Sequence, residues 1–146
     1  MLASAPHGAR LALWQRLKDA LEAETWETLC RSAVPRISAI CESTTSEYTW
    51  MPGRRWWQGR EPEWDVVSTT TDGHATLVGE VKWSGKPCSD AEIERLAGAL
   101  VARPLPPRLP SQTRRVLFVP RTASSATLTH RGVHVIDADA VMKALV

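Results

Sequence analysis

Residues 63–84 read EWDVVSTTTDGHATLVGEVKWS, and this stretch decides the fold. Two runs rich in β-branched and other apolar residues, Trp64 to Thr70 and Ala75 to Trp83, flank the triplet Thr71-Asp72-Gly73. An Asp-Gly pair supplies the positive φ that a tight hairpin turn requires. The pattern therefore predicts two adjacent antiparallel strands.

The chain before this hairpin is predicted to be helical first and then extended. Apolar residues recur at helical spacing over residues 8–34, as one long helix or two short ones, and Pro35 ends the pattern. Further on, Trp50 to Gln58 is aromatic and basic around the turn pair Pro52-Gly53. We predict a second hairpin there.

The chain after the hairpin alternates between helix and strand. Ser89 begins a capping box for a helix over 89–102, which a proline-rich connector follows. Val116 to Val119 is a short apolar run typical of a central strand buried on both faces. Val133 to Ile136 reads as a further strand, and Asp137 or Asp139 can cap a short closing helix.

The predicted order is helix, three strands, helix, strand, strand, helix. A helix that crosses between the hairpin and a later buried strand implies a mixed β-sheet with helices on its faces, an α/β fold. The 146 residues leave room for one domain only, 1–146. Its parts are a helical region 8–34, a sheet region 50–84, the helix 89–102 and C-terminal strands and helix over 115–146.

Composition narrows the functional classes. Hydrophobic residues make up 43% and charged residues 23% of the chain, as in ordinary globular proteins. No stretch approaches the roughly 20 apolar residues of a membrane helix, so we expect a cytoplasmic protein. The sequence has no phosphate-binding glycine loop and no Ser-His-Asp order, which argues against nucleotide hydrolysis and acyl transfer. The formal charge of +2 requires any nucleic-acid binding to come from local clusters.

The hairpin strands carry the residues with chemistry. Side chains alternate faces along a strand, so Glu80 and Lys82 share one face, and Asp65 shares a face with Glu63 and with Val67. Trp64 and Val66 are then expected to point into the core. The strand pairing can bring Asp65 beside Glu80, where Mg²⁺ or Mn²⁺ would relieve the repulsion of two carboxylates and Lys82 could assist an attacking water. The alternative is a weak surface ion pair.

A second cluster is basic and aromatic. Arg54, Arg55 and Arg60 surround Trp56 and Trp57, a mixture that suits phosphate contacts and base stacking. Lys86, one of few lysines, would add to this predicted nucleic-acid surface. A core pair of tryptophans with solvated arginines explains the same segment equally well. Trp83 is expected to pack in the core, because it should face away from Lys82.

The stretches Glu63-Trp64-Asp65-Val66-Val67 and Gly79-Glu80-Val81-Lys82-Trp83-Ser84 resemble the PD-(D/E)xK nuclease superfamily. They resemble in particular the C-terminal domain of archaeal-type P-loop ATPases. The resemblance implies a restriction-endonuclease-like fold with Asp65 and Glu80 as metal ligands and the Val81 carbonyl as a third. It also points to Glu27, on the N-terminal helix, and to Glu63 as further ligands, although a helix-flank glutamate is more often solvated.

These observations lead to three functional hypotheses. The first is a magnesium-dependent nuclease-like domain that hydrolyses DNA phosphodiester bonds. The second is a catalytically silent module that binds DNA or a separate P-loop ATPase. The third is a protein-interaction domain that uses the tryptophan-rich segment as its interface. Each of these three hypotheses is compatible with a homodimer of two copies.

Overall fold

The computed structural model describes residues 6–41, 49–110, 112–124 and 129–146, so residues 125–128 of the predicted C-terminal region lie outside the described residues. In chain order the elements are α1 (His7–Ala33), the 3₁₀ helix η2 (Val34–Arg36), α2 (Ser38–Cys41), β1 (Arg54–Trp56), β2 (Trp64–Thr69), β3 (Ala75–Val81), α3 (Asp90–Ala102), β4 (Gln112–Phe118), β5 (Thr129–His130), β6 (Val133–Ile136) and α4 (Ala138–Leu145).

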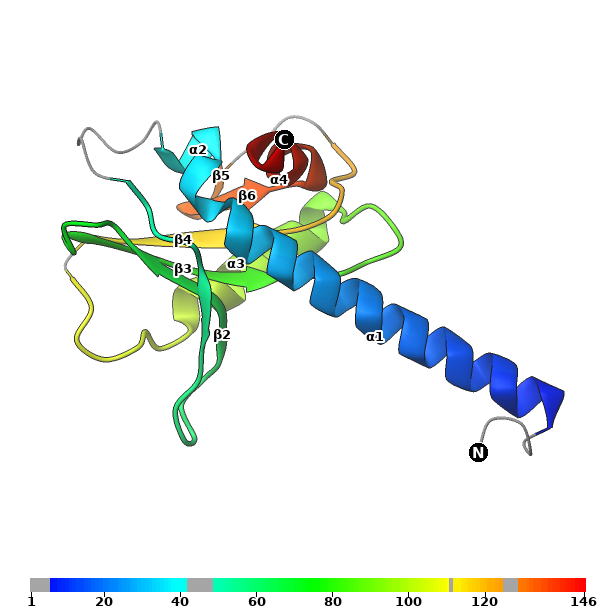
Figure 1. Cartoon of the computed structure of the whole chain (residues 1–146). Helices are drawn as coiled ribbons and strands as arrows, with labels where there is room; N and C mark the ends of the chain where they lie inside the picture. Colours follow the sequence, from blue (N-terminus) through cyan, green and yellow to red (C-terminus); the bar gives the residue numbers. More distant parts are fainter. Residues whose placement is uncertain (1–5, 42–48, 111, 125–128) are drawn as a thin grey trace.

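The described strands form one six-stranded mixed sheet in the order β1-β2-β3-β4-β6-β5 (Figure 1). β3 pairs antiparallel with β2 across the predicted hairpin and parallel with β4, and β4 pairs parallel with β6. α3 forms the crossover that a parallel connection from β3 to β4 requires. Every residue of β3 is buried, as expected for a strand in the middle of the sheet. The predicted α/β fold is confirmed.

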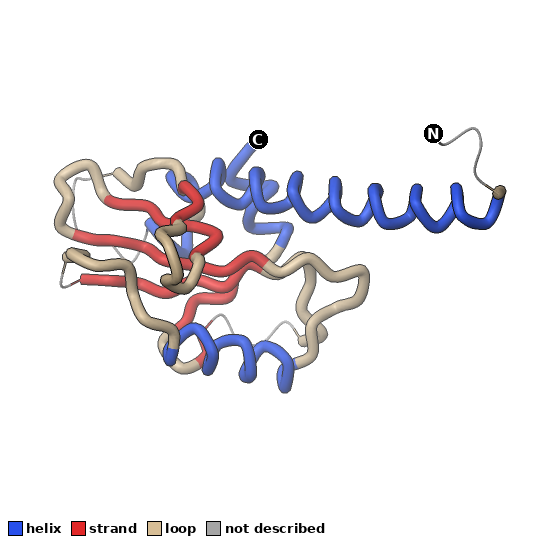
Figure 2. The backbone as a smooth tube through the Cα atoms, turned by 90° about the horizontal axis from the view of Figure 1, so that it is seen from below, coloured by secondary structure: helices blue, strands red, loops and turns tan. Residues whose placement is uncertain are grey.

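Helices cover both faces of the sheet and give it two hydrophobic cores. Figure 2 shows α3 on one side of the strands and α1 with α4 on the other. The core beneath α1 and α4 includes Trp26, Cys30, Leu77, Phe118 and Val141. The core beneath α3 includes Trp64, Val78, Ile93, Leu100 and Leu117. Alternate residues of β3, such as Leu77 and Val78, thus serve opposite cores.

The predicted helix caps are present. The Ser89 hydroxyl accepts the N–H of Glu92 at 3.2 Å, so α3 begins where the capping box placed it. Of the two caps predicted for the closing helix, Asp137 has this role, because its carboxylate accepts the N–H of Ala140 at 2.9 Å.

The N-terminal helical region is one long helix rather than two short ones. Only the last part of α1 packs against the sheet, where Trp26, Cys30 and Ala33 are buried. The first part projects away from the rest of the molecule (Figure 1). No helix of the described segments is long and apolar enough to cross a membrane, and the cytoplasmic location stays a prediction.

The hairpin predicted within Trp50–Gln58 is wrong. Trp50 forms a bridge to Thr70 and β1 pairs with β2, both antiparallel, so this segment runs along one edge of β2 without reversing. Pro52 and Gly53 interrupt the edge strand instead of turning it. A Cβ atom on Gly53 would lie 2.6 Å from Cγ1 of Val66, so only glycine permits this close approach.

The face alternation predicted for β2 is also wrong at its start. Trp64 is buried in the core beneath α3, whereas Val66 is buried in the core beneath α1. Residues two apart would share a face in a regular strand, but the β1–β2 register shifts between Arg54 and Trp56. An irregularity of this β-bulge type inserts one extra residue and re-aims the side chains around it. Asp65 stands between Trp64 and Val66 in the chain, and the side chains of these two neighbours are buried in opposite cores.

Candidate functional site

Asp65 contacts the backbone of β3 directly. Its Oδ2 accepts the N–H of Val81 at 2.8 Å, and its main-chain carbonyl accepts a guanidinium N–H of Arg31 at 3.1 Å. The first bond ties the acid of β2 to the middle of the Glu80-Val81-Lys82 tripeptide. The second ties the same residue to α1. The structure therefore brings Asp65 to the end of β3, as the sequence predicted.

Glu80 is held between two cations. The side chains of Glu80 and Lys82 meet, as their shared face predicted, with 2.6 Å between Oε1 and Nζ. Arg103 approaches from the other side, with 2.5 Å between its guanidinium and Oε2. Because the Glu80 residue is only 7% exposed, these contacts lie in a largely desolvated setting. Both carboxylate oxygens are thus occupied by charged donors.

Arg103 is the site residue that the sequence argument missed. It is the C-cap of α3, and besides Glu80 it contacts the carbonyl of Glu63 at 3.1 Å and the ring of Trp64, whose centroid lies 4.9 Å from its Cζ. The available signal was an arginine that directly follows a helix predicted to pack on the sheet. Nothing local indicated that it would reach a residue 23 positions earlier in the chain.

The two central carboxylates have opposite pKa shifts. Burial raises the pKa of Asp65, the Val81 N–H lowers it in part, and the negative charges of Glu27, Glu80 and Glu63 raise it further. Burial would also raise the pKa of Glu80, but the hydrogen bonds and charges of Lys82 and Arg103 outweigh this and hold it below its usual range. Asp65 thus favours its neutral form more than a free aspartate does, and Glu80 favours its ionised form.

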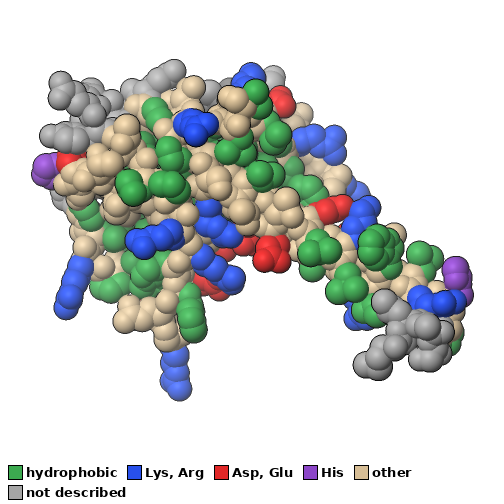
Figure 3. All heavy atoms as spheres, in the orientation of Figure 1, with side chains coloured by type: hydrophobic (Ala, Val, Ile, Leu, Met, Phe, Trp, Pro, Cys, Tyr) green, Lys and Arg blue, Asp and Glu red, His purple; other side chains and the backbone are tan. Residues whose placement is uncertain are grey.

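The two outer acids also have basic partners. Glu27 lies 3.4 Å from the Arg31 guanidinium, one helical turn along α1, and Glu63 forms an ion pair with Arg55. Glu27 is therefore neither purely solvated nor bound directly to Asp65. Figure 3 shows acidic and basic side chains side by side where α1 meets the rest of the molecule.

The five predicted metal ligands do not assemble as one set. Among the described residues, no group of three or more His, Cys, Asp or Glu side chains is placed to hold a metal ion. This arrangement does not fit a structural zinc site or an all-protein calcium cage. Mg²⁺, which keeps several waters and takes one or two carboxylates, needs fewer protein ligands than either of these sites. A cation beside Asp65 would also favour the ionised form that burial disfavours.

The predicted basic and aromatic cluster divides into two parts. Trp56 is half-buried and packs against the core beneath α3, whereas Trp57 is 73% exposed. The core hypothesis thus describes Trp56, and the hypothesis of an exposed stacking residue describes Trp57. The exposed basic side chains on the β1 edge, its loop and the loop after β3 are Arg54, Arg55, Arg60 and Lys86. A shallow pocket lined by Arg55, Trp57 and Glu63 opens at this edge.

Trp83 does not pack in the core as predicted. It is 41% exposed and lies against Trp26 of α1, with 6.4 Å between the ring centroids. The alternation argument failed because β3 ends at Val81, so the face of Trp83 is no longer set by the sheet. The Trp26 indole donates a hydrogen bond to the Lys82 carbonyl at 3.0 Å, which fixes α1 to the chain between Lys82 and Trp83.

The comparisons with known proteins give one result. No curated protein and no solved structure matches the chain. One protein family, described as archaeal and bacterial proteins of unknown function, matches residues 8–96. The match covers more than half of the chain, from the start of α1 through β3 and into α3. The chain therefore belongs to this family, DUF234.

Proposed function

We propose that this chain is a metal-dependent nuclease-like domain that hydrolyses phosphodiester bonds in DNA. The observation that carries the proposal is the bond from the Val81 N–H to Asp65. It puts the acid of one hairpin strand against the tripeptide Glu80-Val81-Lys82 of the other. This contact supports the proposal, because the resemblance to PD-(D/E)xK nucleases implies an acid beside that tripeptide.

The chain supplies oxygen ligands for a metal ion and two basic side chains to this reaction. Asp65 and Glu80 would hold one Mg²⁺ or Mn²⁺, with the Val81 carbonyl as a third oxygen. The ion would polarise the phosphate and lower the pKa of a bound water. Lys82, whose side chain is 43% exposed, can donate to an attacking water or to a phosphate oxygen when it leaves Glu80. Arg103 would keep Glu80 ionised throughout, because it approaches the oxygen that Lys82 does not.

The β1 edge would bind the nucleic acid beside this site. Arg54, Arg55, Arg60 and Lys86 are exposed and suited to phosphates, and the exposed ring of Trp57 suits base stacking. Arg55 already pairs with Glu63, so a phosphate would compete with that glutamate for the guanidinium. Such binding would weaken as salt rises.

A second function follows from the same residues. Lys82 and Arg103 engage both carboxylate oxygens of Glu80, and no three acids gather within the described residues. A site that binds a partner without cleaving DNA would tolerate both features. The alternative proposal is a silent module that binds DNA or a separate P-loop ATPase, as the resemblance to ATPase C-terminal domains suggests.

Cleavage of plasmid and oligonucleotide DNA with Mg²⁺ or Mn²⁺ tests the first proposal. We expect Asp65→Asn and Lys82→Ala to lower the cleavage rate at least about a hundredfold, as loss of a catalytic group does. Glu94→Gln is the matched control, because Glu94 also pairs with two basic side chains but lies on α3. Equal cleavage by all four proteins would reject the assignment.

Binding of Mn²⁺ alone, followed by electron paramagnetic resonance, separates the two functions. Mn²⁺ binding that Asp65→Asn abolishes and Glu94→Gln preserves supports the metal site independently of activity. Salt-sensitive DNA binding with neither Mn²⁺ binding nor cleavage would support the silent module instead.

A further inference from the structure

The first part of α1 carries an uncovered apolar stripe. Leu11, Trp14, Leu17 and Leu21 are 53%, 58%, 46% and 60% exposed. They are three or four residues apart, so they lie on one side of the helix. Figure 1 shows this part of α1 extending away from the sheet, where no other described element covers it. Contiguous apolar surface of this kind marks an interaction site.

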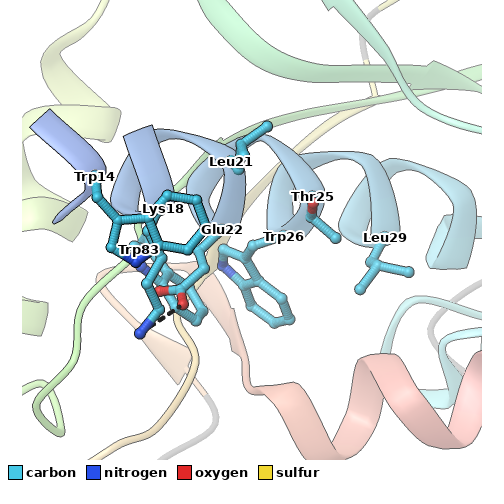
Figure 4. Close-up of a pocket in the computed structure, with 8 residues that line it drawn as sticks. All are labelled: Trp14, Lys18, Leu21, Glu22, Thr25, Trp26, Leu29 and Trp83. Carbon is cyan, nitrogen blue, oxygen red and sulfur yellow. Dashed lines mark ion pairs between the residues drawn. The ribbon is translucent and has the colours of Figure 1, made fainter. Parts of the chain in front are cut away.

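The stripe continues into a groove where α1 meets the chain after β3. Trp14, Leu21, Trp26 and Leu29 of α1 line this groove together with Trp83, around a volume of about 330 Å³ (Figure 4). An ion pair between Lys18 and Glu22, 3.6 Å apart, lies at its rim. The stripe and the groove together offer a continuous surface along α1 that fits an amphipathic helix.

Charge is divided along the same helix. The basic residues Arg10, Arg16 and Lys18 lie in its first half, and the acidic residues Asp19, Glu22, Glu24 and Glu27 lie after them. Arg31 in the last turn is paired with Glu27. Parallel pairing of two such helices would align like charges. Antiparallel pairing places the basic half of each helix against the acidic half of the other. The surface of α1 is therefore complementary to itself in one orientation.

We propose that α1 pairs antiparallel with α1 of a second copy of this chain, about a two-fold axis near Leu17. In this register Trp14 of each copy faces Leu21 of the other, and Arg10 lies within one residue of the position opposite Glu24. Both contacts occur twice, as the isologous interface of a two-fold dimer requires. The first turns of the second helix then cover the groove beside Trp83. The dimer does not depend on the nuclease proposal, because none of its contacts involves Asp65, Glu80 or Lys82.

Sedimentation velocity over a concentration series tests the dimer. We expect a reversible dimer for the native chain and an association at least about tenfold weaker for Trp14→Ala, as for a truncated aromatic anchor. Trp57→Ala is the matched control, since this tryptophan is even more exposed but lies on the loop after β1 and not on α1. Unchanged circular dichroism should show that both variants are folded.

A charge exchange tests the orientation. Arg10→Glu and Glu24→Arg should each weaken the dimer, and the double variant should restore it, because the two positions lie near each other only in the antiparallel pair. A chain that stays monomeric at every concentration would overturn the proposal, even if α1 then bound another protein. Failure of the double variant to restore association would overturn the antiparallel register.

Discussion

The start of β2 and the end of β3 each present one carboxylate to the same site, and the two are treated differently by the fold. Glu80 lies on a strand that is regular and buried throughout, and its carboxylate contacts Lys82 and Arg103. Asp65 lies at the irregular start of β2, and its carboxylate accepts a hydrogen bond from the backbone N–H of Val81. One carboxylate pairs with two side-chain cations, and the other accepts a hydrogen bond from a backbone N–H.

The difference teaches that strand regularity governs which charges meet. Beside this bulge Asp65 contacts the backbone of β3 and α1, where burial and the negative charge of Glu27 raise its pKa. Glu80 and Lys82 meet because the Lys82 N–H still bonds to the Phe118 carbonyl one residue beyond β3, and Glu80 also contacts Arg103 at the end of α3. Two acids one strand apart thereby acquire opposite pKa shifts, a condition that favours separate chemical roles.

Trp64 stabilises the region where the two acids differ, so its removal should have the largest effect. It is fully buried, its indole donates to the Pro104 carbonyl at 3.2 Å, and Arg103 lies over its ring. We expect Trp64→Ala to lower the free energy of unfolding by about 3–5 kcal/mol in urea denaturation. If this variant does not fold, Trp64→Phe should cost about 1 kcal/mol through the lost hydrogen bond. A loss no larger than that of the exposed Trp57→Ala would contradict this role.

Glu80→Gln should have the second-largest effect, because it leaves two cations beside a neutral amide. We expect a loss of about 2 kcal/mol at neutral pH, below the range for a fully buried pair since Lys82 is partly exposed. The loss should disappear in acid. The folded pKa of Glu80 is lowered, so its contribution is present above the unfolded pKa and is lost as pH falls through the folded one. Glu94→Gln, which removes a more exposed paired acid, should change stability much less than Glu80→Gln does.

The parts of this site that the sequence predicted are those set by local rules. The Asp-Gly turn, the Ser89 cap and the two-residue spacing of Glu80 and Lys82 each depend on neighbouring residues, and each is present. The same rules predicted the order of the main elements and hence the mixed sheet, but not the short elements η2, α2 and β5.

The parts that could not be predicted depend on three-dimensional packing. No residue in 63–67 marks the bulge that separates Trp64 from Val66, because the register of β1 against β2 creates it. Arg103 reaches Glu80 only through the angle at which α3 crosses the sheet. The exposed half of α1 has a regular apolar pattern, and periodicity alone cannot say whether such a stripe meets its own sheet or another molecule.

Asp65→Asn should give the smallest effect, with the opposite sign to Glu80→Gln. Asparagine can still accept the Val81 N–H, and it removes a negative charge that burial and Glu27 disfavour. We expect the free energy of unfolding at neutral pH to rise by less than about 1 kcal/mol.

The pH profile of Asp65→Asn makes this last comparison decisive. The folded pKa of Asp65 is raised, so its contribution to stability is fully present below the unfolded pKa and is lost as pH rises through the folded one. The advantage of Asp65→Asn in urea denaturation should therefore be absent in acid, grow as pH rises through the raised pKa and then stay constant. Glu61→Gln, in the exposed loop between β1 and β2, controls for removal of one negative charge. If Asp65→Asn instead loses stability at neutral pH as Glu80→Gln does, then a cation stabilises Asp65 as well, and the two acids are equivalent.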